Sequence, residues 1–346
     1  MRRFGGNKMK AKRLKKITGI LVFLIFLLAF FFYPVNRYVE KPGGIVDLST
    51  LVKINNHKDK EKGSFSLTYV TFQQASYYQL LRANFEPYWD VLSYEQVLGG
   101  STNQESYDFL QNYYFENAQQ MAVYNAFKAA NEKATIQFNG LYVLDFVDGS
   151  KAKKQLKVGD IITHVNGQKL ENSLTLFQVL KNEKPGNQLK LTVKRGNKTL
   201  TMDITLMKDD QNQAKLGIII GSAIDLKTSQ KVAFDAKGFG GPSAGLMFTL
   251  EIYEQLTKEN IRHGQKIAGT GTMDELGNVG QIGGIDKKIV SADKAGVELF
   301  FVPKDQQKED DNEKIAKKVA KQIHTKMKIV PVATFNEALT YLKNQK

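Results

Sequence analysis

The chain has 346 residues, of which 42% are hydrophobic, and this is enough for two or three domains with buried cores. It contains no cysteine, which excludes disulfide frameworks, thiolate zinc sites and cysteine nucleophiles. The formal net charge is +14, but eight of the 49 basic residues lie within the first sixteen positions. The remaining 41 basic residues are nearly balanced by 35 acidic residues. This near balance disfavours nucleic acid as a partner.

An uncharged run follows the basic residues, from Ile17 to Tyr33. At about 1.5 Å per residue it spans about 26 Å, close to the thickness of a hydrocarbon core. A cleavable signal peptide is the alternative. However, the segment at the end of the apolar run, which contains Phe31, Phe32 and Pro34, lacks the small residues of a signal-peptidase cleavage site. We therefore predict a cytoplasmic basic tail over 1–16 and a transmembrane helix in membrane lipid over 17–34. The positive-inside rule then places the remainder outside the cell.

Residues 35–133 are predicted to mix strands and helices. The segment 64–72 alternates as a strand does, and 106–130 has a composition typical of a helix. The aromatic residues in this region favour core packing over a cofactor site.

A compact β-rich unit is predicted over 134–207. Its segment 159–167 reads Gly-Asp-Ile-Ile-Thr-His-Val-Asn-Gly, a strand that ends in a turn; 172–181 is a short helix, and 189–193 with 200–206 form a hairpin. This order resembles a PDZ domain. The resemblance implies that a loop of Asn139, Gly140 and Leu141 receives a peptide carboxylate, and that the peptide lies between the strand from Tyr142 to Phe146 and the helix at 174–180. A structural β-module without a ligand remains the alternative.

A glycine-rich turn at 238–245 leads into a helix, and Ser243 stands at its start. There the hydroxyl faces the positive end of the helix dipole. The turn residues Gly241 and Ala244 are candidates for backbone N–H groups that hold an oxyanion. Ser243 could instead be a simple N-cap, but the crowded glycines favour close approach by another group.

A second segment, 266–296, is predicted as a strand, a turn and a helix. On that helix Lys288 shares a face with Ala292 and Ala295, which suits tight packing. Burial lowers the pKa of an amine, and a shift from about 10.4 to about 7.5 requires about 4 kcal/mol. Lys288 could then take the proton of the Ser243 hydroxyl, with Thr270 orienting the amine.

The neighbouring Lys287 shares its helix face with Ser291 and Lys294. That face is predicted to be solvated.

The sequences GPSAG, AGTGT and GNVGQIGGI, followed by a lysine-bearing helix, resemble the proteolytic domain of the Lon peptidases over 216–342. With the PDZ unit and the anchor, the whole chain resembles the membrane-anchored, PDZ-containing Lon-like proteases of bacteria with a single membrane. The resemblance implies an α+β fold, in which the Lon-type proteolytic domain at 208–346 begins within 35–133 and receives the PDZ domain as an insert. It also implies that Ser243 and Lys288 are catalytic, that Thr270 supports the lysine, and that no cofactor is used.

Two features depart from Lon itself. Lon carries an acidic residue where this chain has Gly240, so any role of that acid is absent. The 346 residues also contain no G-x-x-x-x-G-K-[ST] sequence, the phosphate-binding motif of an ATP-driven unfoldase.

Two rival functions remain open. GPSAG also fits the nucleophile elbow of α/β-hydrolases, but His263 and His324 are the only downstream histidines, and neither has the sequence context of a triad histidine. The four histidines are too dispersed for a metal site. The other rival is a PDZ adaptor with an inactive peptidase domain.

The sequence therefore predicts an ATP-independent, membrane-anchored serine endopeptidase with its catalytic domain outside the cell. Its expected substrates are extracellular peptides, secreted proteins or small membrane proteins, and processing of a signalling peptide is one possibility. The oligomeric state is not indicated.

Overall fold

The structure, a computed structural model, describes residues 4–57, 59 and 61–345, and its chain divides into two compact units. The first unit comprises 1–43 and 70–97, and the second comprises 44–69 and 98–346. Strands β1 (Pro34–Asp47) and β3 (Ser64–Ser76) each pass from one unit into the other.

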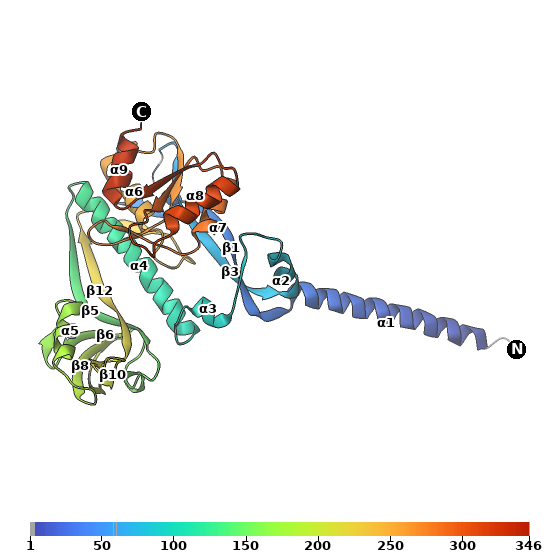
Figure 1. The fold of residues 1–346 in the computed structure, drawn as a ribbon, viewed down its shortest axis with the longest axis horizontal. Helices are drawn as coiled ribbons and strands as arrows, with labels where there is room; N and C mark the ends of the chain where they lie inside the picture. Colours follow the sequence, from blue (N-terminus) through green and yellow to red (C-terminus); the bar gives the residue numbers. More distant parts are fainter. Residues whose placement is uncertain (1–3, 58, 60, 346) are drawn as a thin grey trace. The chain divides into compact units, whose positions relative to one another are not determined.

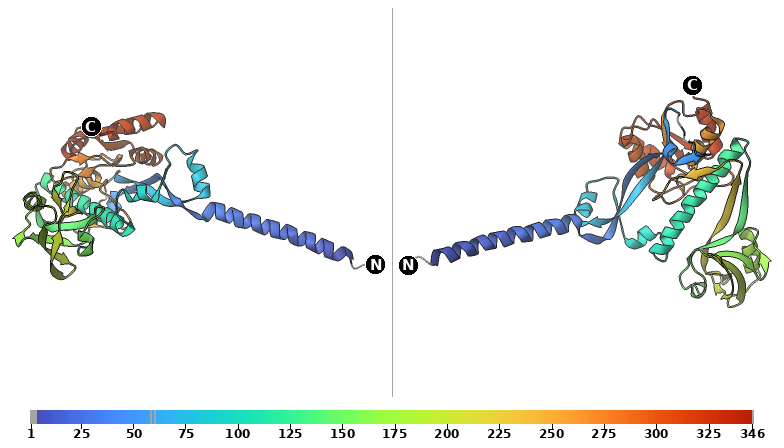
Figure 2. Two further views of the ribbon diagram at one scale, coloured as in Figure 1. Left: turned by 60° about the horizontal axis from the view of Figure 1, so that its bottom comes forward. Right: turned by 180° about the vertical axis from the view of Figure 1, so that it is seen from behind.

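The first unit contains helix α1 (Phe4–Phe32), which is uninterrupted in all ribbon views (Figures 1 and 2). Its residues 12–32 are long and apolar enough to cross a membrane. The helix begins earlier than predicted, and it ends at Phe32 because Tyr33 precedes a proline, which disfavours helical backbone. The unit also contains α2 (Tyr77–Ala83), β4 (Asp90–Leu92) and most of α3 (Tyr94–Leu98); β4 pairs with β1 in antiparallel orientation.

The catalytic part of the second unit is built on a parallel sheet. Strand β14 (Lys266–Gly269) lies between β3 and β17 (Leu299–Pro303), and β17 also pairs with β18 (Lys328–Val332). The segment before the PDZ unit thus supplies a strand beside β14, as the family resemblance implied. The remaining elements of this part are η1 (Leu48–Thr50), β2 (Val52–Ile54), α4 (Gln104–Ala129), β13 (Val232–Phe234), α6 (Gly245–Thr257), β15 (Thr272–Met273), β16 (Val279–Gly280), α7 (Ile285–Lys294), α8 (Asn312–Gln322) and α9 (Phe335–Lys343).

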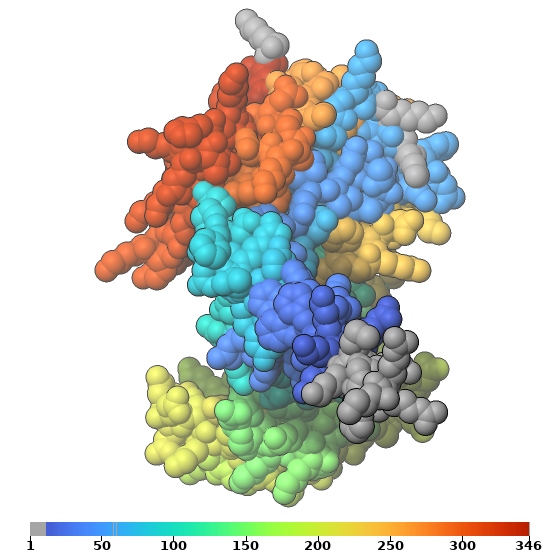
Figure 3. All heavy atoms as spheres, turned by 90° about the vertical axis from the view of Figure 1, so that its right-hand side faces the viewer, coloured from blue at the N-terminus to red at the C-terminus, as the bar shows by residue number. Residues whose placement is uncertain are grey.

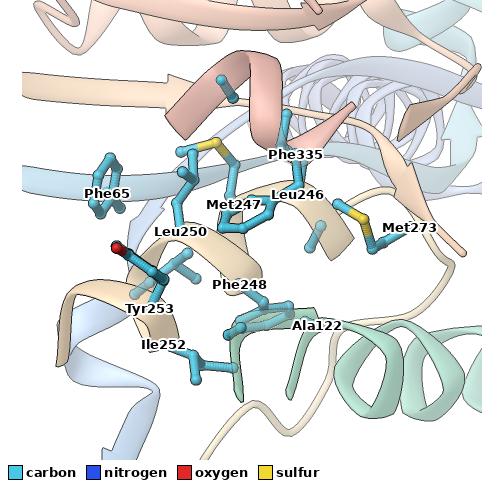
Figure 4. Packing of buried hydrophobic residues seen from close by; sticks show 14 of the residues in the cluster. Phe65, Ala122, Leu246, Met247, Phe248, Leu250, Ile252, Tyr253, Met273 and Phe335 are labelled. Atoms are coloured by element: carbon cyan, nitrogen blue, oxygen red, sulfur yellow. The ribbon is translucent and has the colours of Figure 1, made fainter. Parts of the chain in front are cut away.

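Helix α6 lies at the centre of the catalytic core. Residues 245–254 are all buried, so the helix is enclosed on every side rather than along one stripe. Figure 4 shows Leu246, Met247 and Phe248 packed among residues from other elements, including Phe335 of α9 and Ala122 of α4. Because α6 is packed on all sides, its position is fixed, and the turn that precedes it is held in place as well.

The PDZ part has its own core and its own sheet, in the order β12-β5-β6-β8-β9. Figure 1 shows β5 and β12 running side by side over their length. The predicted helix at 172–181 and the predicted hairpin are confirmed as α5 and as β8 with β9. The elements are β5 (Ala134–Phe146), η2 (Ala152–Lys154), β6 (Ile161–Val165), β7 (Gln168–Lys169), α5 (Ser173–Lys181), β8 (Gln188–Arg195), β9 (Lys198–Thr205), β10 (Met207–Lys208), β11 (Ala214–Lys215) and β12 (Ile218–Thr228).

The predicted loop at 139–141 is wrong, and its peptide-binding role stays a prediction. Asn139, Gly140 and Leu141 do not form a loop but lie within β5. Leu141 and Tyr142 are paired with β6 on one side and with β12 on the other, so β5 has no open edge there. Gly140 is needed for a different reason, because a Cβ atom at this position would lie 2.4 Å from the Ile162 carbonyl oxygen.

The sheet of this part extends beyond residue 207, where the sequence predicted the end of the unit. Strand β12, which follows that boundary, pairs with β5 of the PDZ sheet. Within the residues that the structure describes, no strand pairs with the other side of β12. Strand β12 is therefore one of the two edge strands of this sheet, and β9 is the other.

Candidate active site

The turn before α6 positions Ser243. Gly241 has a φ of +80°, a conformation that favours glycine, and Pro242 follows it. Gly245 begins the helix where a Cβ atom would lie 2.8 Å from Cβ of Met273. The glycines of this turn thus allow both a backbone with positive φ and close packing of the start of the helix against β15.

Lys288 reaches the Ser243 hydroxyl from α7. Its side chain is only 3% exposed, and Nζ donates a hydrogen bond to Oγ of Ser243 at 2.7 Å. Nζ also donates to Oγ1 of Thr270 at 2.9 Å. Ser243 itself is half-buried, so the hydroxyl lies at the boundary between the core and solvent while the amine lies inside.

Thr270 and Gly271 hold the backbone of Ser243. Oγ1 of Thr270 donates to the Ser243 carbonyl oxygen at 3.0 Å, and the Gly271 N–H donates to the same oxygen at 2.9 Å. Since the hydroxyl proton of Thr270 is committed to that carbonyl, its oxygen is left to accept from Lys288. One threonine therefore fixes both the serine backbone and the lysine amine.

The structure brings together the three residues singled out in the sequence. Ser243 comes from the turn before α6, Thr270 from the end of β14, and Lys288 from the second turn of α7. The predicted burial of the Lys288 face is confirmed, because Ala292 is also buried. Their catalytic roles remain predictions at this point.

The predicted solvation of the neighbouring face is wrong. Lys287 and Ser291 are both buried, and Nζ of Lys287 lies 3.2 Å from a carboxylate oxygen of Asp286. The period of the helix indicated one buried face, but α7 is covered on two sides. An ion pair makes this second buried ammonium tolerable.

The two candidate oxyanion donors differ in their surroundings. The N–H of Gly241 donates to the carbonyl oxygen of Gln111 in α4 at 3.0 Å. It is therefore occupied in this conformation, and Gly241 acts as a turn residue instead. For the N–H of Ala244, which caps α6, no acceptor is found among the described residues. Ala244 is the better candidate.

Gln111 is the residue that the sequence did not reveal. Besides accepting from Gly241, it places its Cβ atom 3.2 Å from the position that a Cβ atom of Gly240 would take. It lies on a helix more than a hundred residues before the serine, and no motif surrounds it. Only the packing of α4 against α6 brings it to the turn.

The two downstream histidines lie in other surroundings. His263 is exposed, and its Nε2 lies 3.2 Å from the Leu342 carbonyl oxygen. His324 lies in a turn that follows the end of α8. The Ser243 hydroxyl is paired with an amine, which disfavours a hydrolase triad based on imidazole.

Comparisons with known proteins agree with this arrangement. Residues 232–344 match the Lon protease (S16) C-terminal proteolytic domain, and residues 108–206 match the PDZ domain. Lon protease of Metamycoplasma arthritidis is 35% identical over 102 residues, which are 30% of this chain and 11% of that protein. Lon protease of Xanthomonas oryzae pv. oryzae is 23% identical over 337 residues, which are 89% of this chain and 37% of that protein. The chain thus spans much less than two thirds of these relatives.

The PDZ domain of the SdrC-like protein from Listeria monocytogenes is 28% identical and covers 25% of this chain and 92% of that domain, with a TM-score of 0.24. The PDZ match to the family begins inside α4, and the proteolytic match contains Ser243, Thr270 and Lys288. The chain therefore combines a segment that matches the PDZ domain with an α+β segment, residues 232–344, that matches the proteolytic domain of Lon protease.

Proposed function

We propose that this chain is a serine endopeptidase in which Ser243 is the nucleophile and Lys288 is the general base. The observation that supports it most is the 2.7 Å contact between Nζ of Lys288 and Oγ of Ser243, with the amine buried and the hydroxyl within reach of solvent. Removal from water disfavours the ammonium form, so the surroundings favour the neutral amine that a base requires.

The geometry accounts for each proton. Neutral Lys288 keeps one N–H bond directed at Thr270, and its lone pair accepts the proton of Ser243 Oγ. Oγ then bonds to the carbonyl carbon of the substrate, and the carbonyl oxygen becomes an oxyanion near the N–H of Ala244. As the C–N bond breaks, the Lys288 ammonium returns the proton to the leaving amine. Water then attacks the acyl carbon while the neutral amine of Lys288 takes its proton. As the bond between the acyl carbon and Oγ breaks, the Lys288 ammonium returns that proton to Ser243 Oγ, which restores the starting state.

We place substrate capture at the open edge of β12 rather than at β5. Tyr113 and Gln120 of α4 donate hydrogen bonds to the carbonyl oxygens of Ser222 and Ile224, so α4 covers the later part of this strand. The earlier part, from Ile218 to Ile220, follows β11, which is packed beside α5. An extended peptide could extend the sheet there by main-chain hydrogen bonds.

Exposed apolar side chains lie on α5, which contacts β11, and on β12 itself. Leu174 and Phe177 of α5 and Ile219 of β12 are all exposed. Such side chains suit the alternate apolar residues of a peptide strand.

The substrates that fit are already unfolded, short or locally flexible, because no phosphate-binding motif of an unfoldase occurs in the sequence. With α1 as a single-pass anchor and its basic end in the cytoplasm, the proteolytic domain would lie outside the cell. Secreted peptides and small membrane or secreted proteins are then the accessible substrates, and maturation of a signalling peptide is one task that this arrangement suits.

The test is hydrolysis of unstructured fluorogenic peptides by the full chain in lipid vesicles. Ser243→Ala should lower kcat/KM by at least about a thousandfold, because the nucleophile is lost. Lys294→Ala, at an exposed position of the same helix as Lys288, is the matched control and should behave as the unsubstituted chain does. Undiminished hydrolysis by Ser243→Ala would exclude the proposed function, and peptide binding without any hydrolysis would favour the adaptor.

A further inference from the structure

A short helix of the first unit lies against the end of the candidate membrane span. The ring of Tyr78 in α2 is 4.9 Å from that of Phe31 and 6.3 Å from that of Phe30, measured between centroids. The two helices α1 and α2 are in contact. Figure 3 looks at the molecule from the N-terminal side, with the blue surface of the N-terminal residues in front. A helix in contact with the last turn of a membrane span lies at the level of the lipid headgroups.

The apolar side chains of α2 and of the residues after it are not taken up by the protein. No residue of α2 is buried, although its sequence is Tyr-Tyr-Gln-Leu-Leu-Arg-Ala. Tyr77 is 51% exposed, Leu81 is 54% exposed and Phe85 is 79% exposed. Leu81 lies one helical turn after Tyr77, and Phe85 lies four positions further on. Large apolar side chains gathered in this way mark a surface that is covered by something else.

The polar neighbours fit a membrane boundary. Trp89 is held between two cations, with Nζ of Lys41 at 4.9 Å and Cζ of Arg82 at 4.8 Å from its ring centre. Tryptophan and tyrosine concentrate where lipid chains meet headgroups, and basic side chains there reach the phosphates. The first unit thus combines apolar, aromatic and basic side chains next to the span itself.

We propose that Tyr77, Tyr78, Leu81 and Phe85 form a membrane-docking surface that inserts into the boundary between lipid chains and headgroups. This inference rests on the proposed anchoring by α1 and adds a second contact with the same bilayer. Two contacts restrict the tilt of the first unit on the membrane, as a single flexible tether would not. The partner is the lipid surface, identified by its continuity with α1.

Trp89 makes the proposal measurable, because it is the only tryptophan of the chain. The full chain is placed in vesicles of phosphatidylcholine and phosphatidylglycerol whose acyl chains carry bromine either near the headgroup or near the bilayer centre. Bromine near the headgroup should quench Trp89 fluorescence more strongly than bromine near the centre. The double substitution Leu81→Ser with Phe85→Ser should reduce this quenching and shift the emission to longer wavelength.

Two controls separate the possible failures. Leu276→Ser removes an equally exposed apolar side chain from the second unit and should leave the quenching unchanged. Flotation of the vesicles reports whether the chain is anchored at all. A chain that does not float with the vesicles would refute the anchor on which the proposal rests. A chain that floats, but whose Trp89 is not quenched or is quenched equally after the double substitution, would overturn the docking surface alone.

Discussion

Thr270 uses one hydroxyl group to organise two neighbours. It donates its proton to the Ser243 carbonyl oxygen and accepts from Nζ of Lys288, and it is fully buried. An amine on a flexible four-carbon chain needs such a partner, because otherwise its lone pair is free to turn away from the serine. The threonine thus acts on the reaction through the lysine and is a positioning residue.

The substitution Thr270→Val keeps the shape of the side chain and removes this hydroxyl. We expect kcat to fall about tenfold to a hundredfold with little change in KM, because the amine is less well aligned in the transition state. Thr270→Ser, which restores the hydroxyl, should recover most of the rate. Steady-state kinetics of the three proteins measure this, and an unchanged kcat in Thr270→Val would show that the lysine is aligned by other contacts.

At the scale of elements, α4 links the PDZ part to the nucleophile turn. Its Tyr113 donates to β12, and two residues earlier Gln111 accepts the Gly241 N–H. A Cβ atom at Gly221 would lie 2.5 Å from the Tyr113 ring, so this glycine allows the helix to approach the sheet closely. The helix therefore contacts both parts through residues two positions apart, by the main-chain carbonyl oxygen of Gln111 and by the side chain of Tyr113.

The contact between Gln111 and Gly240 can be tested by a pair of substitutions. Gly240→Ala pushes a methyl group against Gln111 Cβ and should lower kcat about tenfold by displacing the turn. Adding Gln111→Gly removes the opposing atom and should restore much of the rate. The matched control is Asn112→Gly at an exposed position of α4. It destabilises the helix by the same amount, about 1 kcal/mol, but does not change the contact with Gly240. A loss that Gln111→Gly does not relieve would contradict this account.

The local sequence pattern was sufficient to predict several helices and strands and to single out Ser243 and Lys288. The helices at 106–130 and 172–181 and the hairpin after residue 188 follow from periodicity and turn residues, and the motif around Ser243 pointed to its lysine partner. The pairing of β5 with β12 was missed because the two strands lie about 80 residues apart in the sequence. An alternating pattern predicts a strand but does not specify which other strand it pairs with. Lys287 and Gln111 were missed for the same reason, since tertiary packing decides their surroundings.

At the scale of the whole molecule, the PDZ part and the proteolytic part form one unit of the chain. The β5–β12 pair belongs to the PDZ sheet at one end, and side chains near its other end pack against the catalytic core. Binding at the open edge of β12 would thus hold a substrate on the same unit as Ser243. Such binding should affect affinity more than the chemical step.

This expectation is tested by comparing one unstructured peptide with a free C-terminal carboxylate and with a C-terminal amide. If chain ends are captured beside β12, amidation should raise KM about tenfold and leave kcat unchanged. This is expected because the substrate and the transition state would lose the same binding contact. Phe177→Ser in α5 should raise KM for the free acid in the same direction, and Leu276→Ser should not. Equal KM values for acid and amide would place substrate recognition elsewhere.

The central claim is that the buried amine of Lys288 takes the proton of Ser243, and the most direct measurement is the hydrolysis rate of Lys288→Arg beside Lys288→Met. Arginine keeps a positive charge but does not release its proton, and methionine fills the space without any base. We predict that both variants retain the circular dichroism spectrum of the unsubstituted chain and hydrolyse peptide no faster than Ser243→Ala. Hydrolysis by a folded Lys288→Arg or Lys288→Met variant within about tenfold of the unsubstituted rate would contradict the account.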